Sequence, residues 1–348
     1  MAAPSAEVLW QCFFERSTQG VVVLDRNGYI LAANTAMEQI LMARRGELLG
    51  REMAAALQDA TGSLGDLIAE VLKSGQPGQA EASWKGQEGE ERTSRVAVIP
   101  VANDAGDVAG LVALVQDVTV EAGQRGQLER QVGEIHALQD VLIETLAALA
   151  EWRDPGITGH LRRIRTYTRI LTEELAARGA EDLGSKEHRQ HVARSAVLHD
   201  VGKIAVPEGI LLKPAPLSPE EYSVVQMHTV VGARILEDAD RALSERTGQA
   251  RTFLRLGAEI ARWHHERWDG RGYPDGLRGE MIPLHARVVA LVDVYDALTT
   301  RRVYKEAWGH EQAVEEIRAS RGTHFDPEVV QAFLAVEKEF ARVHQART

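Results

Sequence analysis

Residues 264–276 of this 348-residue chain read HHERWDGRGYPDG, and residues 199–203 read HDVGK. In each segment, two adjacent side chains that can ligate metals follow an apolar, helix-like run. No cysteine competes for a metal in either segment, because the only cysteine of the chain is Cys12. Paired imidazole and carboxylate ligands are typical of hydrolytic sites that hold two or more metal ions. The two segments together therefore predict a helical domain built around a metal centre.

The adjacency of the ligands predicts how many ions they hold. We place both pairs, His199–Asp200 and His264–His265, on helices. Neighbouring side chains on a helix point about 100° apart, because the helix turns every 3.6 residues. Two adjacent ligands are therefore hard to aim at one ion but can serve two neighbouring ions. We expect a two-metal site.

Asp293 gives a separate indication of a cation. It interrupts the apolar run of residues 288–295. A buried carboxylate without a partner is strongly unfavourable, so it must be paired or bound to a cation. The alternative partner is an internal arginine such as Arg287 or Arg302, but the number of histidines available as ligands favours a metal. Asp296, one turn later, is expected to accept a hydrogen bond rather than to bind metal.

The composition is that of a globular protein with two domains. The length exceeds what one typical hydrophobic core supports. Charged residues make up 26% and hydrophobic residues 44% of the chain, which is ordinary for soluble proteins. No apolar stretch approaches the ~20 residues that span a bilayer, and residues 1–8 do not read as a secretory signal. With a single cysteine, this favours a cytoplasmic protein without membrane insertion.

The formal net charge of −11 argues against broad nucleic-acid binding. An anionic nucleotide would therefore need a local cluster of basic side chains. Residues 301–305 contain such a cluster, formed by Arg301, Arg302 and Lys305. We expect no nucleic acid as a partner.

Residues 1–120 are expected to form a mixed α and β domain. A turn at residues 25–28 separates the first two strands, and Asn34 is placed to cap a helix after the second. The runs that read as strands are residues 20–24, 29–33, 94–101 and 108–119. This order resembles a PAS sensor domain, with an unspecific α+β module as the alternative. The sequence does not identify a ligand for the sensor.

Residues 121–150 show a heptad pattern. Apolar residues follow alternating steps of four and three, with Gln139 at the one polar position of the seam. The apolar seam positions are Leu128, Val132, Ile135, Leu142, Leu146 and Leu149. A polar residue in such a seam can fix the register of a parallel dimer, so we expect a coiled coil and a parallel homodimer. The alternative is a single amphipathic helix packed on its own domain.

Residues 151–348 are expected to be helical. Ser218 followed by Pro219 and Glu221 is a capping box with proline at the first helical position. Asp326 starts another helix in the same way. Several helices with inward-facing ligands describe an α-helical metal-site domain.

The segments 199–203 and 264–276 together resemble the HD-GYP family, metal-dependent phosphodiesterases that cleave the bacterial second messenger cyclic di-GMP. The resemblance covers roughly residues 142–333, and the Gly-Tyr-Pro of residues 272–274 is the loop that names the family. It implies a multidomain protein with an α+β PAS-like sensor, a helical coiled-coil linker and an all-α HD-type metal-site domain. The expected reaction is hydrolysis of cyclic di-GMP to linear pGpG, with GMP left open as a further product.

Two alternative functions remain open. The domain can be a catalytically silent cyclic di-GMP receptor that signals through partner proteins. It can also be an HD-type hydrolase of another nucleotide.

The family pattern implies a set of metal ligands in which Asp200 bridges two ions. His160 and His228 enter this set through the resemblance alone, because either by itself would be interpreted as a hydrogen-bonded core histidine. The implied ligands are His160, His199, Asp200, His228, His264, His265 and Asp293. Some members hold a third ion with a Glu four residues before the first ligand His, where this chain has Gly156. We therefore expect two divalent ions, with iron favoured by resemblance and manganese, nickel, cobalt or zinc as alternatives.

The remaining site residues are expected to contact the substrate. Lys203, one turn beyond His199, is positioned to steady a phosphate oxygen during catalysis; the alternative is a surface lysine. Arg302 and Lys305 match the family's phosphate-contacting positions, and a guanidinium group binds phosphate oxygens in a bidentate manner. Tyr273 of the Gly-Tyr-Pro loop is expected to face the substrate.

Overall fold

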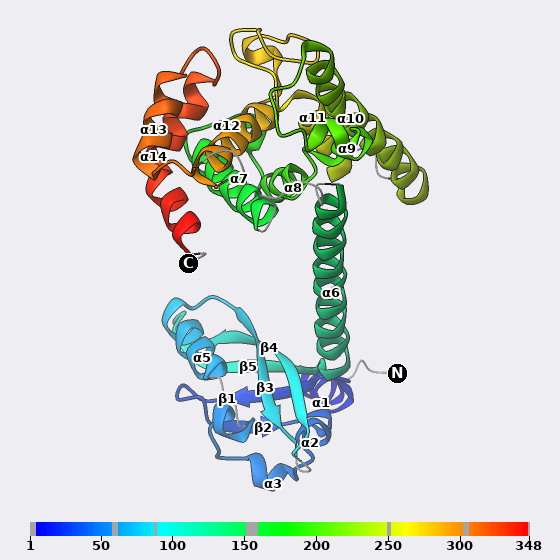
Figure 1. Ribbon diagram of the computed structural model, residues 1–348. Coiled ribbons are helices and arrows are strands. Elements are labelled where there is room, and N and C mark those ends of the chain that lie inside the picture. The colour runs from blue at the N-terminus through cyan, green and yellow to red at the C-terminus, as the bar shows by residue number, and fades with distance from the viewer. Residues whose placement is uncertain are drawn as a thin grey trace. The chain divides into compact units, whose positions relative to one another are not determined.

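The computed structural model describes residues 5–57, 62–86, 89–150, 159–248, 252–301 and 306–346. The chain forms two compact units, Met1–Glu134 and Ile135–Thr348. The boundary between them lies inside one continuous helix, α6 (Thr119–Ala150), rather than at residue 120 or 150 (Figure 1). It lies there because the C-terminal part of α6 packs on the second unit, as described below.

The first unit contains a five-stranded antiparallel sheet in the order β2-β1-β5-β4-β3. Its strands are β1 (Gly20–Leu24), β2 (Ile30–Ala33), β3 (Gly78–Lys85), β4 (Glu91–Ala102) and β5 (Val108–Asp117). The four strands expected from the sequence are confirmed to within a few residues. The sequence analysis did not predict β3, whose residues GQAEASWK include no β-branched side chain. Its pairing with β4 along its whole length holds it in the sheet.

Short helices pack against this sheet and complete the core of the first unit. The helices of the unit are α1 (Ala6–Arg16), α2 (Thr35–Leu41), α3 (Arg45–Leu48), α4 (Met53–Ala56) and α5 (Ser63–Ser74). Asn34 caps α2 as expected, since its Oδ1 accepts from the backbone N–H of Met37 at 2.9 Å. The same oxygen accepts from Val21 of β1 at 2.9 Å, and Nδ2 donates to the carbonyl of Phe14 in α1. One buried amide therefore ties β1, α1 and α2 together.

Helix α6 presents its heptad seam to solvent. The six apolar seam residues named above have exposed fractions between 43% and 61%. A different face of the helix packs on the second unit, where Ile143, Ala147 and Ala150 are buried. The face that contacts its own domain is therefore not the heptad seam, which leaves the seam open to a partner.

The second unit is helical, and its described residues contain no strand. Its helices are α7 (His160–Ala177), α8 (Lys186–Ala196), α9 (Glu208–Leu211), α10 (Pro219–Thr247), α11 (Phe253–Trp263), α12 (Leu284–Thr299), α13 (His310–Ala319) and α14 (Pro327–Gln345), with 3-10 turns η1 (Glu181–Leu183), η2 (Val201–Ala205) and η3 (Gly279–Met281). The capping box of Ser218 is confirmed, with Ser218 Oγ accepting from Glu221 N at 3.2 Å. Asp326 caps α14 as expected. Across the described residues, no helix combines the length and apolar character needed to cross a bilayer.

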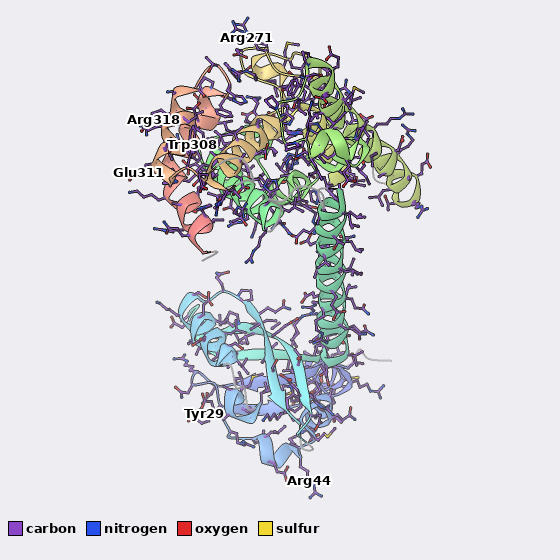
Figure 2. All side chains as sticks on the ribbon, in the orientation of Figure 1. Tyr29, Arg44, Arg271, Trp308, Glu311 and Arg318 are labelled. Carbon is purple, nitrogen blue, oxygen red and sulfur yellow. The ribbon has the colours of Figure 1, made fainter. Side chains whose placement is uncertain are left out.

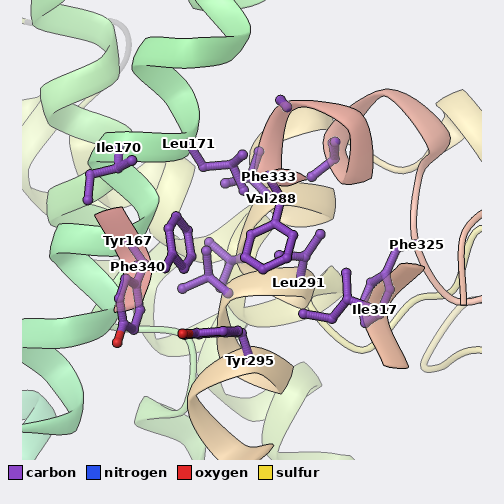
Figure 3. Close-up of a cluster of buried hydrophobic side chains, with 14 of the residues drawn as sticks. Tyr167, Ile170, Leu171, Val288, Leu291, Tyr295, Ile317, Phe325, Phe333 and Phe340 are labelled. Carbon is purple, nitrogen blue, oxygen red and sulfur yellow. The ribbon is translucent and has the colours of Figure 1, made fainter. Parts of the chain in front are cut away.

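The core of the second unit surrounds α12, of which no residue is exposed. Figure 3 shows its aromatic part, where Tyr167 of α7 stacks on Phe340 of α14 with ring centroids 4.5 Å apart. Tyr295 of α12 meets Tyr167 edge-on at 5.3 Å. This packing fixes α7 against α12, and it thereby fixes the polar residues that these two helices bring to the site.

Candidate metal centre

The two predicted ligand pairs lie just past the ends of helices. Helix α8 ends at Ala196, and His199 and Asp200 follow in a turn before η2. Helix α11 ends at Trp263, and His264 is its C-cap residue. The expectation that both pairs lie within helices is therefore wrong. At these helix ends, the carbonyl oxygens of Ala196, Ile260 and Ala261 lie within hydrogen-bond distance of the Nδ1 atoms of His199 and His264.

Three of the histidines are held by backbone carbonyls in a common manner. Nδ1 of His199 lies 2.9 Å from the carbonyl oxygen of Ala196, and Nδ1 of His228 lies 2.6 Å from that of Val225. Nδ1 of His264 lies 3.1 Å from two carbonyl oxygens near the end of α11. A carbonyl oxygen can only accept, so Nδ1 must carry the proton of each neutral ring. The lone pair of each ring is thereby placed on Nε2, the nitrogen that faces the centre.

The seven predicted ligands form two clusters. One cluster contains Asp200, His228, His264 and His265, and the other contains His160, His199 and Asp293. Within each cluster, the candidate ligand atoms all lie within 4.8 Å of one another. The spacing suits one cation per cluster, and ligation of metal by these residues stays a prediction.

Asp200 stands between the two clusters. Its Oδ1 lies 3.3 Å from Nε2 of His228 and 3.8 Å from Nε2 of His264. Its Oδ2 lies 3.2 Å from Nε2 of His199, which is 3.8 Å from Oδ1 of Asp293. One carboxylate oxygen therefore faces each cluster, which is the geometry of a bridging ligand.

The residues present fit divalent cations. Buried polar atoms in proteins are nearly always hydrogen-bonded. Yet Asp200 Oδ1, His228 Nε2 and His264 Nε2 are buried and find no hydrogen-bond partner within the part of the chain that the structure describes. Nitrogen and oxygen donors of this kind suit iron, manganese, nickel, cobalt and zinc.

The protonation states at the centre favour ligation. Burial and the neighbouring His199 lower the pKa of His264 to about 3. Burial likewise holds the pKa of His265 well below its usual value. Burial alone would raise the pKa of Asp200, but the nearby charge of Lys203 and the imidazole of His199 outweigh it and hold the pKa well below the usual range. The imidazoles of His264 and His265 are thus neutral and the carboxylate of Asp200 is ionised, as metal ligands must be.

Lys203 lies at the centre rather than on the open surface. It belongs to η2, and its ammonium group donates to Oδ2 of Asp200. Only 17% of its side chain is exposed. This location agrees with the expected catalytic role, which stays a prediction.

The Gly-Tyr-Pro loop folds back on the ligand pair. The ring of Tyr273 stacks on His265 with centroids 4.7 Å apart. A Cβ at Gly272 would lie 2.4 Å from the backbone nitrogen of Arg267, so this approach requires glycine. Burial raises the pKa of Tyr273, so its phenol stays protonated and can donate a hydrogen bond. In Figure 2, Arg271 of the same loop points away from the unit.

Glu266 anchors this loop and was not anticipated from the sequence. It is buried, and its Oε1 accepts from the backbone N–H of Asp275 at 2.7 Å. Asp275 in turn accepts from Arg262 and Trp263 of α11. A charged residue directly after the ligand pair was the available signal, but its partner could not be inferred.

His160 and Asp293 are brought to the second cluster by α7 and α12. Asp296 accepts from Nδ1 of His160 at 2.7 Å, which confirms its expected role as an acceptor. Arg287, the alternative partner for Asp293, pairs with Asp326 instead. The other alternative partner, Arg302, lies outside the described residues.

Arg302 and Lys305 lie outside the described residues, as does Gly156, on which the expectation of two rather than three ions depends. Neighbouring Arg301 is described, and it is exposed and paired with Glu306 at 3.1 Å.

A glycine contact holds η2, which begins directly after Asp200, against α10. A Cβ at Gly202 would lie 2.0 Å from the carbonyl oxygen of His228 and 2.5 Å from the backbone nitrogen of Gly232. We expect Gly202→Ala to separate η2 from α10, to lower stability by about 1–3 kcal/mol or more, and to weaken metal binding. Thermal unfolding and metal analysis measure both effects.

Gly209→Ala is the matched control for this prediction. Among the described residues, no heavy atom lies within 4 Å of a Cβ at this position of α9. We expect unchanged metal content and a stability change of at most about 1 kcal/mol. A Gly202→Ala protein with wild-type stability and metal content would contradict the tight contact.

The fold and the site together define a protein in which an α/β unit precedes a helical unit with two clusters of imidazole and carboxylate groups. Residues 144–329, more than half of the chain, match the family described as HD domain, and residues 14–123 match the PAS fold. The chain belongs to the HD domain family. The resemblances to HD-GYP proteins and to PAS domains expected from the sequence are confirmed.

Three similar proteins of Vibrio cholerae are informative. One named probable cyclic di-GMP phosphodiesterase is 43% identical over 217 residues, which cover 62% of this chain and 48% of the relative. One named cyclic di-GMP phosphodiesterase is 42% identical over 238 residues, covering 68% and 46%. One named 3'3'-cGAMP-specific phosphodiesterase 2 is 36% identical over 203 residues, covering 58% and 35%. The chain thus spans about half the length of the first two relatives.

Proposed function

We propose that this protein is a metal-dependent phosphodiesterase that hydrolyses cyclic di-GMP to linear pGpG, under the control of its PAS domain. The observation that supports this most strongly is the position of Asp200, with one carboxylate oxygen toward each of two ligand clusters. Relatives named as cyclic di-GMP phosphodiesterases support the choice of substrate. Whether pGpG is cleaved further to GMP is decided by the same product analysis.

The residues of the chain divide the catalytic work. When bound, two divalent cations supply a water of lowered pKa and neutralise the charge of the attacked phosphodiester. Asp200 would help to hold both cations, and the backbone-anchored imidazoles of His199, His228 and His264 would present Nε2 to them. We assign to Lys203 the stabilisation of negative charge that develops on the phosphate. Tyr273, stacked on His265, is placed to contact the substrate from the loop side.

We further propose that each chain holds two ions and that iron is the native metal. Two separate ligand clusters support the number, and the all-nitrogen-and-oxygen donor set supports a metal of this class. Metal analysis of protein purified without oxygen tests both statements. Three well-occupied ions per chain would refute the first, and zinc as the only metal that sustains turnover would refute the second.

The substrate alternative is another cyclic dinucleotide. A relative named as specific for 3'3'-cGAMP is 36% identical to this chain, which makes 3'3'-cGAMP the second candidate substrate. We propose cyclic di-GMP because the two relatives with higher identity carry that name. Parallel rate measurements with both nucleotides discriminate between them.

Arg302→Ala is expected to weaken the affinity for cyclic di-GMP about 10- to 100-fold without changing metal content. A guanidinium contact to a phosphate oxygen contributes on this scale, and the side chain does not ligate metal. Titration with nucleotide and metal analysis measure the two quantities. Arg318→Ala is the control, because Arg318 lies outside the basic cluster of residues 301–305 and is exposed and paired with Glu315. Unchanged affinity together with loss of metal would refute the assignment of Arg302.

Regulation is proposed to pass through α6. The helix joins the PAS fold to the unit that holds the ligands, and its heptad seam is open for a parallel homodimer. A change in the coil's rotation or register would then bias two arrangements of the catalytic pair. Removal of residues 1–120 is expected to change the rate and leave the metals in place, as rate assays and metal analysis would show. A cytoplasmic location and signalling protein partners belong to the same proposal.

A further inference from the structure

A buried ion pair lies directly behind the second ligand cluster. Arg163 of α7 donates to Asp296 of α12 through Nε, and through Nη2 at 2.8 Å, so that the contact is bidentate. Asp296 Oδ2 also accepts from Nδ1 of His160 at 2.7 Å. Arg163 is 4% and Asp296 is 1% exposed, so both charged groups are almost completely desolvated.

His160 differs from the other anchored histidines in its acceptor. His199, His228 and His264 direct Nδ1 to backbone carbonyls. His160 is the first residue of α7, and the first turn of a helix offers free N–H groups rather than free carbonyls. Within the described residues, the acceptor for Nδ1 of His160 is the side chain of Asp296.

A single carboxylate on a rotatable side chain would hold the ring loosely. The bidentate contact with the planar guanidinium of Arg163 fixes both oxygens of Asp296. Buried ion pairs on average add little net stability, so the contribution of this pair is better sought in geometry.

The same arginine contacts Thr300, which directly precedes the basic cluster of residues 301–305. Nη2 of Arg163 donates to Oγ1 of Thr300 at 3.0 Å, and the Thr300 N–H donates to the carbonyl of Asp296 at 2.9 Å. Arg163 therefore links Thr300, at the C-terminal end of α12, to Asp296, the acceptor of His160. Residues 301–305 follow immediately in the chain.

We propose that Asp296 and Arg163 are positioning residues that aim Nε2 of His160 at the second ion, the one held with His199 and Asp293. The inference rests on the proposed two-ion centre and adds to it a support that acts on one ion only. Neither residue is expected to touch metal or substrate.

The test is equilibrium dialysis of the full-length protein with Mn²⁺ alone. In Asp296→Asn we expect the dissociation constant of one Mn²⁺ to rise about 10- to 100-fold, as when the hydrogen-bond partner of a ligating histidine is removed. The other Mn²⁺ keeps its affinity. Anomalous scattering then finds the retained ion among Asp200, His228, His264 and His265.

Arg163→Lys keeps the positive charge but loses the bidentate contact, so a smaller weakening of the same ion is expected. This variant carries the test if Asp296→Asn does not fold. Asp326→Asn is the matched control, because it removes the negative charge of the comparable buried pair with Arg287. We expect it to lower thermal stability and to leave both Mn²⁺ affinities unchanged.

The outcomes separate the two levels of the proposal. Wild-type protein that fails to bind two Mn²⁺ would refute the metal centre itself. Wild-type binding of two ions, with unchanged or equally weakened affinities in folded Asp296→Asn and Arg163→Lys, would refute the positioning role alone.

Discussion

Replacement of Asp200 by alanine is expected to abolish hydrolysis of cyclic di-GMP, with a loss of about 10³-fold or more in kcat. The carboxylate directs one oxygen to each ligand cluster, so its removal disturbs both ion positions at once. Losing a single preorganised electrostatic contact in an active site already costs about 10²–10³-fold. Chromatography of the products measures the rate, and metal analysis is expected to show weakened binding of both ions.

Asp200→Asn is the companion variant for this prediction, because it preserves the volume of the side chain and removes its charge. It separates loss of the bridging anion from collapse of the buried site. Wild-type turnover by a folded Asp200→Ala protein would contradict the proposed mechanism.

The second large expected effect concerns dimerisation through α6. Substitution of Leu142 and Leu146 by glutamate is expected to convert a parallel dimer into monomers. Burying a leucine side chain contributes about 1.5–3 kcal/mol, and both residues are more than half exposed in the single chain. The substitutions do not alter Ile143 or Ala147, which pack on the second unit, so metal content is expected to stay unchanged.

Sedimentation measures the oligomeric state of the wild-type and substituted proteins. Arg130→Glu is the control, because it adds a glutamate to an exposed position of α6 outside the seam. A wild-type protein that is monomeric at micromolar concentration would contradict the dimer.

Local signals made part of the fold predictable. The caps at Asn34 and Ser218 depend on side chains close to the helix start, and both were found as expected. Helix α5 was missed although its apolar residues recur at helical spacing, so the signal was present. Strand β3 was missed for a different reason, since tertiary pairing with β4 overrides its weak propensity.

The site shows the same division between local and long-range information. Ligand types and their adjacency could be read from the sequence, and the structure brings all seven residues into two clusters. The support of His160 could not be read, because Arg163 and Asp296 are 133 residues apart in the chain. The only sign of this contact in the sequence is that Arg163, a charged residue three positions after the predicted ligand His160, lies on the apolar face of α7.

The most direct test of the central claim is chromatography of cyclic di-GMP after incubation with protein purified without oxygen, with and without a metal chelator. We predict that the metal-loaded protein forms linear pGpG and that the chelated protein does not. Tight binding of cyclic di-GMP without turnover, under each of the five candidate metals, would contradict the account and favour a silent receptor.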